Sequence, residues 1–175
     1  MKYCPECGSA NVKFENDQKL SCMNCGLVYF QNVAAATACI ISTEQGILFV
    51  ERKKEPGKGK LGMPGGFINP RESAVQGVRR ECREEIGFDP GADVEFFASF
   101  PNVYPYKNIV YHTCDLYFTV SAPTLKLSDL KIDSKETVSV HFIKPKNIIL
   151  EDIAFYSARE ALKAFLEKSS LWNIK

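Results

Sequence analysis

Three glutamates in one short stretch have the spacing of a metal site. Residues 80–85 read RECREE, which places Glu81, Glu84 and Glu85 at positions i, i+3 and i+4. In a helix these carboxylates lie on one side, within an arc of roughly 100°. A hard divalent cation such as Mg²⁺, which prefers oxygen ligands, would offset their mutual repulsion. For this hexapeptide alone, a solvated face neutralised by neighbouring arginines is the competing interpretation.

A second set of candidate ligands lies near the N-terminus. Cys4 and Cys7 form one C-x-x-C pair, Cys22 and Cys25 form another, and a glycine follows each pair. Two such pairs predict a closed tetrahedral zinc site made of four thiolates, which leaves no position open for a substrate. The expected role of the zinc is to fold a module of about 30 residues that cannot bury a core alone. The other three of the seven cysteines fall in apolar stretches, and we interpret them as core residues.

The elements that would position the glutamates follow from periodicity and turn chemistry. Ser73 and Gln76 form a capping box, apolar residues follow at spacings of three and four, and Gly87 ends the predicted helix. A second helix is predicted to open at Ser157, with Glu160 completing another capping box. Strands are predicted at residues 33–42, 47–51, 94–100, 110–120 and 137–143, and residues 53–66 (KKEPGKGKLGMPGG) are predicted to form a loop. Strands around two helices indicate a mixed α/β layer fold.

The glutamate helix and its approach resemble the box of the Nudix family. That box reads G-x5-E-x7-R-E-U-x-E-E-x-G-U, where U is a bulky apolar residue, and this sequence has every spacing intact. The matching residues are Gly66, Glu72, Arg80, Glu81, Cys82, Glu84, Glu85, Gly87 and Phe88. Cys82 in an aliphatic position is the one departure. The resemblance implies a Nudix-type α/β/α sandwich with a mixed sheet at residues 32–175, preceded by a small zinc ribbon at residues 1–31.

The resemblance also implies roles for individual residues. Glu81, Glu84 and Glu85 would bind Mg²⁺ or Mn²⁺ with help from the carbonyl of Gly65. Arg80 and Glu72 would orient these glutamates. Glu136 occupies a position where many members carry a further acid, so Glu81 and Glu136 are both candidates for the general base.

Candidate substrate-binding residues lie on both sides of the box. Arg52, Lys58 and Lys60 precede it and are predicted to meet substrate phosphates, although a merely solvated basic loop is an equally good interpretation of each. Tyr104 and Tyr106 follow the box between prolines. They are predicted to stack on an adenine or nicotinamide ring, and the alternative is that both rings only cover the sheet.

The combination of a zinc ribbon and a Nudix domain is similar to the NADH pyrophosphatase subfamily. Two departures from that subfamily are expected. The larger domain that precedes its ribbon is absent, and its S-Q-P-W-P-F-P-x-S signature has only a degenerate echo in residues 99–106 (SFPNVYPY). The prediction is metal-dependent hydrolysis of a nucleoside diphosphate linked to another group, with NADH, NAD⁺ or ADP-ribose first. Alternatives are a dinucleoside-polyphosphate or oxidised-nucleotide hydrolase, and a non-catalytic nucleotide-binding module.

Composition limits the partners. The 22 Lys and Arg nearly balance the 21 Asp and Glu, so no overall field draws the chain to nucleic acid or a membrane, and a small-molecule nucleotide is the expected partner. Nucleic-acid binding by the ribbon is the minor alternative. No apolar run approaches the roughly 20 residues that span a bilayer, and the N-terminus lacks a signal peptide's apolar core. We therefore expect a cytoplasmic protein, and the sequence leaves a homodimer open.

Overall fold

The chain folds into two compact units, Met1–Val33 and Ala34–Lys175, in a computed structural model that describes residues 1–16 and 18–172. The smaller unit holds the strands β1 (Val12–Glu15), β2 (Lys19–Cys22) and β3 (Val28–Phe30), which form one antiparallel sheet in the order β1-β2-β3. The larger unit holds the strands β4 (Ala34–Thr43), β5 (Gly46–Arg52), β6 (Leu61–Gly62), β7 (Gly65–Phe67), β8 (Glu95–Tyr106), β9 (Ile109–Ser121) and β10 (Thr137–Ile143). Its helices are α1 (Ala74–Ile86) and α2 (Tyr156–Trp172), with short 3-10 turns at Gly91–Asp93, Leu127–Asp129, Pro145–Asn147 and Leu150–Asp152.

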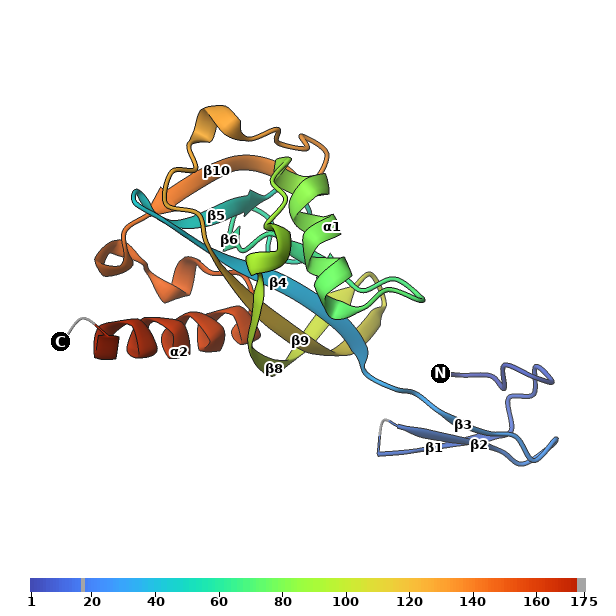
Figure 1. Ribbon diagram of the computed structural model, residues 1–175. Helices are drawn as coiled ribbons and strands as arrows, with labels where there is room; N and C mark the ends of the chain where they lie inside the picture. The colour runs from blue at the N-terminus through green and yellow to red at the C-terminus, as the bar shows by residue number, and fades with distance from the viewer. Residues whose placement is uncertain (17, 173–175) are drawn as a thin grey trace. The chain divides into compact units, whose positions relative to one another are not determined.

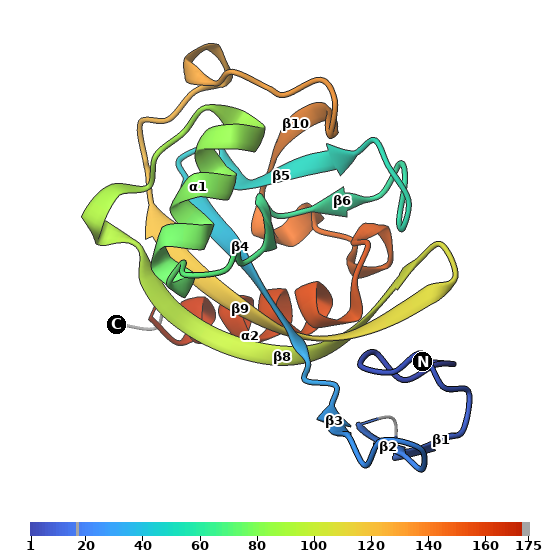
Figure 2. The same cartoon turned by 90° about the vertical axis from the view of Figure 1, so that its right-hand side faces the viewer.

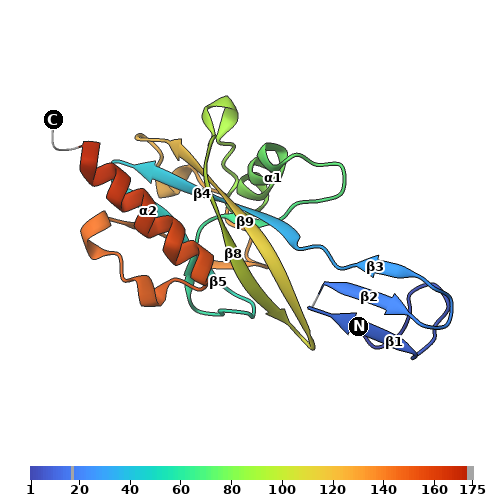
Figure 3. The ribbon, with the colours of Figure 1, turned by 90° about the horizontal axis from the view of Figure 1, so that it is seen from below.

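The larger unit is a mixed sheet between two helices. Its main path runs β10-β5-β4-β9-β8, with β6 paired to β5 and β7 paired to β4. β4 and β9 run parallel, whereas the other pairs are antiparallel. α1 covers one face and α2 the other, with β4, β8 and β9 between them (Figures 1 and 3). Figure 2 looks onto the face that α1 covers. The predicted mixed α/β sandwich is confirmed.

Each helix packs its apolar stripe into a separate core. On one face, Val78, Cys82 and Ile86 of α1 are buried with Cys39 and other side chains of the sheet. On the other, Ala161 and Leu162 of α2 are buried, and Phe165 and Leu166 pack beside them. The core assignment of Cys39 and Cys82 is confirmed, while Cys114 is only half-buried. Within the described part of the chain, neither helix is long and apolar enough to cross a membrane.

The predicted capping chemistry sets the ends of α1. The Ser73 side chain accepts from the backbone N–H of Gln76 at 3.2 Å, and the Gln76 side chain accepts from the Ser73 N–H at 2.8 Å. Gly87 adopts the left-handed conformation at the C-terminal end, with φ of 69°. Because both ends are fixed by local bonds, the three glutamates between them keep a defined helical spacing.

The segment at residues 53–66 and the start of α2 differ from the sequence-based prediction. Residues 53–66 were predicted as a loop, yet they contain β6 and the start of β7, because Gly65 and Gly66 pair with β4 through their backbones. A Cβ at Gly65 would collide with the carbonyl oxygen of Thr37, so this approach requires a residue without a side chain. Ser157 lies inside α2 rather than before it, and its hydroxyl bonds to Asp115 instead of capping the helix.

Candidate active site

A cavity of about 490 Å³ lies in the larger unit. It is lined by acidic side chains of α1, the glycines of β7, aromatic side chains and several buried polar groups of β8 and β9. A concave site that combines apolar walls with a few convergent polar groups is typical of a small-molecule site. The predicted site residues can therefore be placed relative to this cavity.

Glu85 is the buried acid of the cavity. The residue is 9% exposed, and its Oε2 accepts a hydrogen bond from the backbone N–H of Gly65 at 3.2 Å. Burial raises the pKa of Glu85 to about 8, against the opposing effect of the Gly65 N–H, and the charges of Glu81 and Glu136 raise it further. Among the described residues no side chain forms an ion pair with Glu85. A cation in the cavity would stabilise its ionised form.

Glu81 also lines the cavity and lies against the glycine turn. Its side chain is 12% exposed, and its Oε1 lies 2.7 Å from Nη1 of Arg80. Burial raises the pKa of Glu81, and Arg80 opposes that shift. A Cβ built on Gly66 would lie 2.7 Å from Oε1 of Glu81, so the glycine makes room for this carboxylate.

Arg80 links the acids around the entrance of α1. Its guanidinium donates to both carboxylate oxygens of Glu72, at 2.9 and 3.0 Å, and to the backbone carbonyl of Phe67. It also donates to Glu84 at 2.9 Å. The bond from Arg80 is the main cause of the lowered pKa of Glu72, so this pair stays ionised. The Glu84 side chain is 60% exposed and does not line the cavity in this structure.

The end of β5 and the start of β10 bring further charges to the cavity. Glu136 lines the cavity and forms an ion pair with Lys54 at 2.8 Å. Arg52 also lines it, donates to the carbonyl of Pro56 at 2.9 Å, and lies 4.8 Å from the ring centre of Phe155. Lys58 and Lys60 do not line the cavity, and the Lys60 ammonium donates to the carbonyl of Glu151.

Tyr104 and Tyr106 both line the cavity. The Tyr104 ring packs edge-on against Phe67, with ring centres 5.4 Å apart, and lies 5.6 Å from Phe155. Sequence reasoning missed Phe67 and Phe155. Phe67 directly follows Gly65 and Gly66, so its position in the sequence could have indicated that it lies at the site. Phe155 lies in an irregular segment before α2, and no motif in the sequence marks it.

The sequence analysis also missed a buried polar cluster of the cavity, made of Thr113, Asp115, Tyr117 and Ser157. The first three alternate along β9 and line the cavity, and Ser157 comes from α2. All four residues are less than 9% exposed. The available signal was a polar residue at every second position of the strand from Thr113 onward, with apolar residues between them.

The α1 acids and their surroundings fit a hard divalent cation. Glu81 and Glu85 supply carboxylate oxygens within one cavity, and the buried carboxyl group of Glu85 has no cationic side chain bonded to it among the described residues. This oxygen-rich, net negative donor set is the one that Mg²⁺ or Mn²⁺ prefers. In this structure Glu84 shares Nη1 of Arg80 with Glu81, but unlike Glu81 and Glu85 it does not line the cavity.

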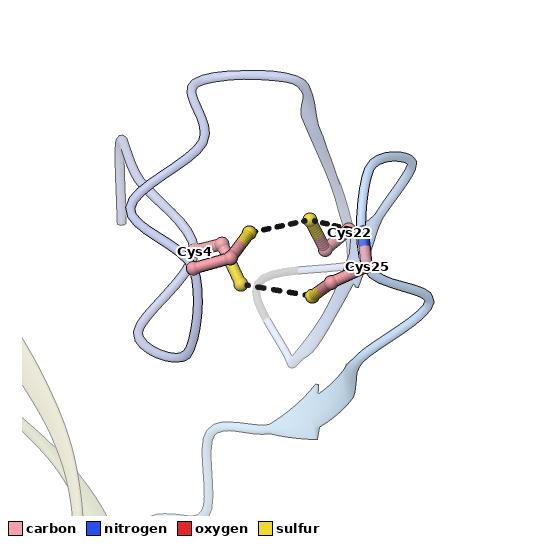
Figure 4. Close-up of side chains that lie close together, drawn as sticks. Cys4, Cys22 and Cys25 are labelled. Carbon is pink, nitrogen blue, oxygen red and sulfur yellow. Dashed lines mark hydrogen bonds between the residues drawn. The ribbon is translucent and has the colours of Figure 1, made fainter.

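The four cysteines of the smaller unit gather their sulfur atoms, all within 4.8 Å of one another. The Sγ of Cys4 lies 3.7 Å from that of Cys25, and the Sγ of Cys7 lies 3.6 Å from that of Cys22 (Figure 4). Four sulfurs at about 2.3 Å from a central zinc would be roughly 3.8 Å apart, so the cluster could hold zinc. The backbone N–H of Cys25 is the main cause that lowers the pKa of Cys22 to about 6, which favours the thiolate.

The turns that carry the cysteines are built alike. Gly8 donates its N–H to the carbonyl of Cys4 at 3.0 Å, and Gly26 donates to the carbonyl of Cys22 at 3.0 Å. Both glycines are left-handed, with φ of 70° and 77°. The glycine after each C-x-x-C pair therefore closes the turn that presents two sulfurs to the same point.

Comparison with known proteins agrees with this geometry. A model of the NUDIX domain matches residues 32–165. The crystal structure of a NUDIX hydrolase from Nitrosomonas europaea is 28% identical and superposes with a TM-score of 0.66, over 96% of this chain and 92% of that one.

Two curated relatives match over shorter lengths. The NAD-capped RNA hydrolase NudC of Vibrio atlanticus (strain LGP32) is 26% identical over 105 residues, which is 60% of this chain and 38% of the relative. The ADP-ribose pyrophosphatase of Methanocaldococcus jannaschii is 40% identical over 57 residues, 33% of this chain and 34% of the relative. This chain thus spans well under half the length of either relative.

Proposed function

Because this chain belongs to the Nudix family, we propose that it hydrolyses the diphosphate bond of a nucleoside diphosphate linked to another group, with NADH, NAD⁺ or ADP-ribose as the substrate class. The observation that carries the proposal is the convergence of Glu81, Glu85 and Glu136 on a cavity that also holds aromatic rings. Acids without a full set of cationic partners suit a metal, and the rings suit a base or nicotinamide.

Each site residue has a role in this proposal. Glu81, Glu84 and Glu85, with the carbonyl of Gly65, would hold Mg²⁺ or Mn²⁺, which when bound supplies positive charge for the diphosphate oxygens and activates water. For Glu84 this requires a rotation away from Arg80. Arg80 and Glu72 orient the acids through the bonds described above.

Proton transfer and phosphate binding fall to residues around the acids. Glu81 and Glu136 are the proposed acceptors for the proton of the attacking water, and their position in the lining of the cavity supports this role. Arg52 and Lys54 line it as well and are proposed to meet phosphate oxygens. Phosphate contacts by Lys58 and Lys60 stay predictions that would need their loop to move.

We also propose what kind of domain each of the two units is. Residues 1–31 form a zinc ribbon with a structural Zn²⁺ held by Cys4, Cys7, Cys22 and Cys25, and residues 32–175 form the hydrolase domain. The sulfur separations support the first assignment, and the two compact units support the boundary. The homodimer and the cytoplasmic location stay predictions.

A second candidate substrate is an RNA that carries an NAD cap, as the name of the Vibrio relative suggests. Such a cap presents the same nicotinamide, diphosphate and adenosine. The overall charge of the chain gives this candidate no separate support.

The deciding experiment is a product screen with Mg²⁺ on NADH, ADP-ribose, NAD-capped RNA, dinucleoside polyphosphates and oxidised nucleotides. We expect cleavage of NADH or ADP-ribose into two phosphate-bearing products. Glu85→Gln should lower kcat by at least about a hundredfold because it removes a metal-binding charge while keeping the shape of the side chain. Glu95→Gln, at an exposed position of β8, is the matched control. Wild-type turnover by Glu85→Gln would refute the site, and binding without any cleavage would favour the non-catalytic module.

A further inference from the structure

The polar cluster of Thr113, Asp115, Tyr117 and Ser157 is not used by the proposed chemistry. Thr113 donates its hydroxyl to Oδ1 of Asp115 at 2.6 Å, and Ser157 donates to Oδ2 at 2.6 Å. Asp115 is 7% exposed, and no side chain of the described residues forms an ion pair with it. Burying a carboxylate is costly unless hydrogen bonds compensate for the lost water, so a carboxylate at this position requires a reason.

The hydroxyl groups of the cluster form hydrogen bonds that end at Asp115. Ser157 has one proton and gives it to Asp115, so the 2.9 Å contact between Ser157 and Tyr117 must use the proton of Tyr117. Burial raises the pKa of Tyr117, which keeps that proton in place. Both carboxylate oxygens of Asp115 therefore accept a hydrogen bond from a hydroxyl of the protein.

Asp115 retains acceptor capacity that faces the cavity. A carboxylate offers about four lone-pair positions, and the two hydroxyls occupy two of them. The Asp115 side chain lines the cavity, so the remaining positions are available to a ligand. Such an acceptor selects for a donor and disfavours another acceptor.

A further polar group of the cavity lies on the same face of the sheet as Asp115. Asn102 is 9% exposed, lines the cavity and pairs across the sheet with Thr113, so it lies on the same face as Asp115. Its amide offers both a donor and an acceptor to a polar ligand beside Asp115.

Aromatic walls define the shape of that ligand. Tyr104 and Phe155 line the same cavity, with ring centres 5.6 Å apart. A planar heterocycle can pack against such rings while a substituent reaches the polar cluster. The site therefore combines a surface for a flat ring with an acceptor for an N–H group.

We propose that Asp115, oriented by Thr113 and Ser157, is a specificity-determining residue that accepts a hydrogen bond from an amino group on the ring system of the substrate. The proposal rests on the proposed function for its substrate class. Two parts of a nicotinamide adenine dinucleotide carry such a group, the 6-amino group of adenine and the carboxamide of nicotinamide. Replacing that NH₂ by oxygen places an acceptor against the carboxylate.

Three dinucleotides that differ at single groups test this proposal. They are NAD⁺, nicotinamide hypoxanthine dinucleotide, in which oxygen replaces the adenine amino group, and nicotinic acid adenine dinucleotide, in which a carboxylate replaces the carboxamide. We expect one of the two replacements to lower kcat/KM and weaken binding by about tenfold or more, the loss expected for one hydrogen bond to a charged group. Which replacement matters identifies the ring that lies at Asp115.

Asp115→Asn should remove that discrimination, reducing the penalty to about threefold or reversing it, because the amide also presents a donor. Thr113→Val keeps the charge but removes one orienting hydroxyl, and should give a smaller loss of discrimination. Asp93→Asn, at an exposed 3-10 turn, is the matched control and should keep the wild-type ratio. Melting temperatures identify any variant that loses discrimination through unfolding.

Calorimetric dissociation constants, measured in a Glu85→Gln background to prevent turnover, separate this proposal from the proposed function. If no dinucleotide is hydrolysed but the binding ratios follow the expected pattern, the hydrolase proposal fails and the Asp115 proposal stands. Equal affinities for all three dinucleotides, an unchanged ratio in Asp115→Asn, or no binding of any of them would overturn the Asp115 proposal.

Discussion

Two buried carboxylates of the cavity, Glu85 and Asp115, are stabilised in different ways. Glu85 receives one backbone N–H, from Gly65, and its pKa is raised to about 8. Asp115 receives two hydroxyl donors at 2.6 Å. Glu85 therefore needs a cation to be ionised at neutral pH, whereas Asp115 is supplied with donors by the protein itself. Glu85 is therefore suited to binding a metal ion, whereas Asp115 is suited to accepting a hydrogen bond from a ligand.

At the same scale, Gly66 should be required for the position of Glu81. In Gly66→Ala the new Cβ would lie 2.7 Å from Oε1 of Glu81, and the flexible carboxylate would have to move. A displacement of about 1 Å at a catalytic group can cost roughly a hundredfold in rate, so we expect kcat to fall at least tenfold. The melting temperature should change little, because the end of a side chain yields rather than the backbone. Steady-state kinetics and thermal melting check this, and an unaltered kcat would show that Glu81 is not confined by Gly66.

At the scale of elements, the features that could be predicted from the sequence are those set by local hydrogen bonds and by the periodicity of apolar residues. α1 could be bounded because Ser73, Gln76 and Gly87 act within a few residues of the helix ends. β8 was predicted to end at residue 100, yet it continues to Tyr106 through two prolines. Proline cannot donate to a ladder, but β8 is the edge strand, and among the described residues it pairs with β9 alone, so its other side needs no partner.

The candidate site was only partly predictable, because a sequence shows residues at fixed local spacings but not residues that meet only through tertiary packing. The acids of α1 have a fixed helical spacing, and the cysteine pairs have a fixed ligand spacing, so both were visible in the sequence. Asp115 and Ser157 are 42 residues apart and meet only because α2 packs on the sheet beside β9. The distribution of basic residues also escaped prediction, because Lys54 lines the cavity while Lys58 and Lys60 do not.

The end of α1 should make folding stability depend on pH through Asp89. Arg79 donates to both oxygens of Asp89, Arg83 adds a bond of 3.0 Å, and Arg79 is the main cause of the lowered pKa of Asp89. A carboxyl whose pKa is lower in the folded state stabilises the fold above its unfolded pKa, about 4, and loses that contribution as pH falls toward the folded value.

The Asp89 side chain is 39% exposed, so we expect a contribution of only about 0.5–1 kcal/mol at pH 7. Urea unfolding of wild type and Asp89→Asn should show that difference at pH 7 and a smaller one at pH 3, with Asp93→Asn as the control. A difference that stays constant or grows at pH 3 would contradict the assignment.

At the scale of the whole molecule, the two units differ in what holds them together. The larger unit buries two apolar clusters, one on each face of its sheet. Among the described residues of the smaller unit (1–16 and 18–33), Leu20 is the large side chain that is fully buried, while Tyr3, Val28 and Phe30 are exposed. Three short strands with so little buried apolar surface are not stable alone in water. Four clustered thiolates can bind a metal ion, and the free energy of that binding would supply the folding stability that apolar burial does not.

The smaller unit should therefore depend on zinc for its fold. Structural zinc contributes about 10–16 kcal/mol in small modules, far more than one buried leucine. Cys22→Ser should lose the bound zinc, whereas Cys114→Ser, which changes a half-buried cysteine outside the cluster, should retain one zinc per chain. We expect amide NMR signals of residues 1–33 to collapse toward random-coil positions in Cys22→Ser, while those of β4 to α2 stay dispersed. Native protein that contains no zinc but keeps dispersed signals for residues 1–33 would show that the four sulfurs do not need a metal. Loss of dispersion in both units at once would show that the larger unit depends on the ribbon for its own fold.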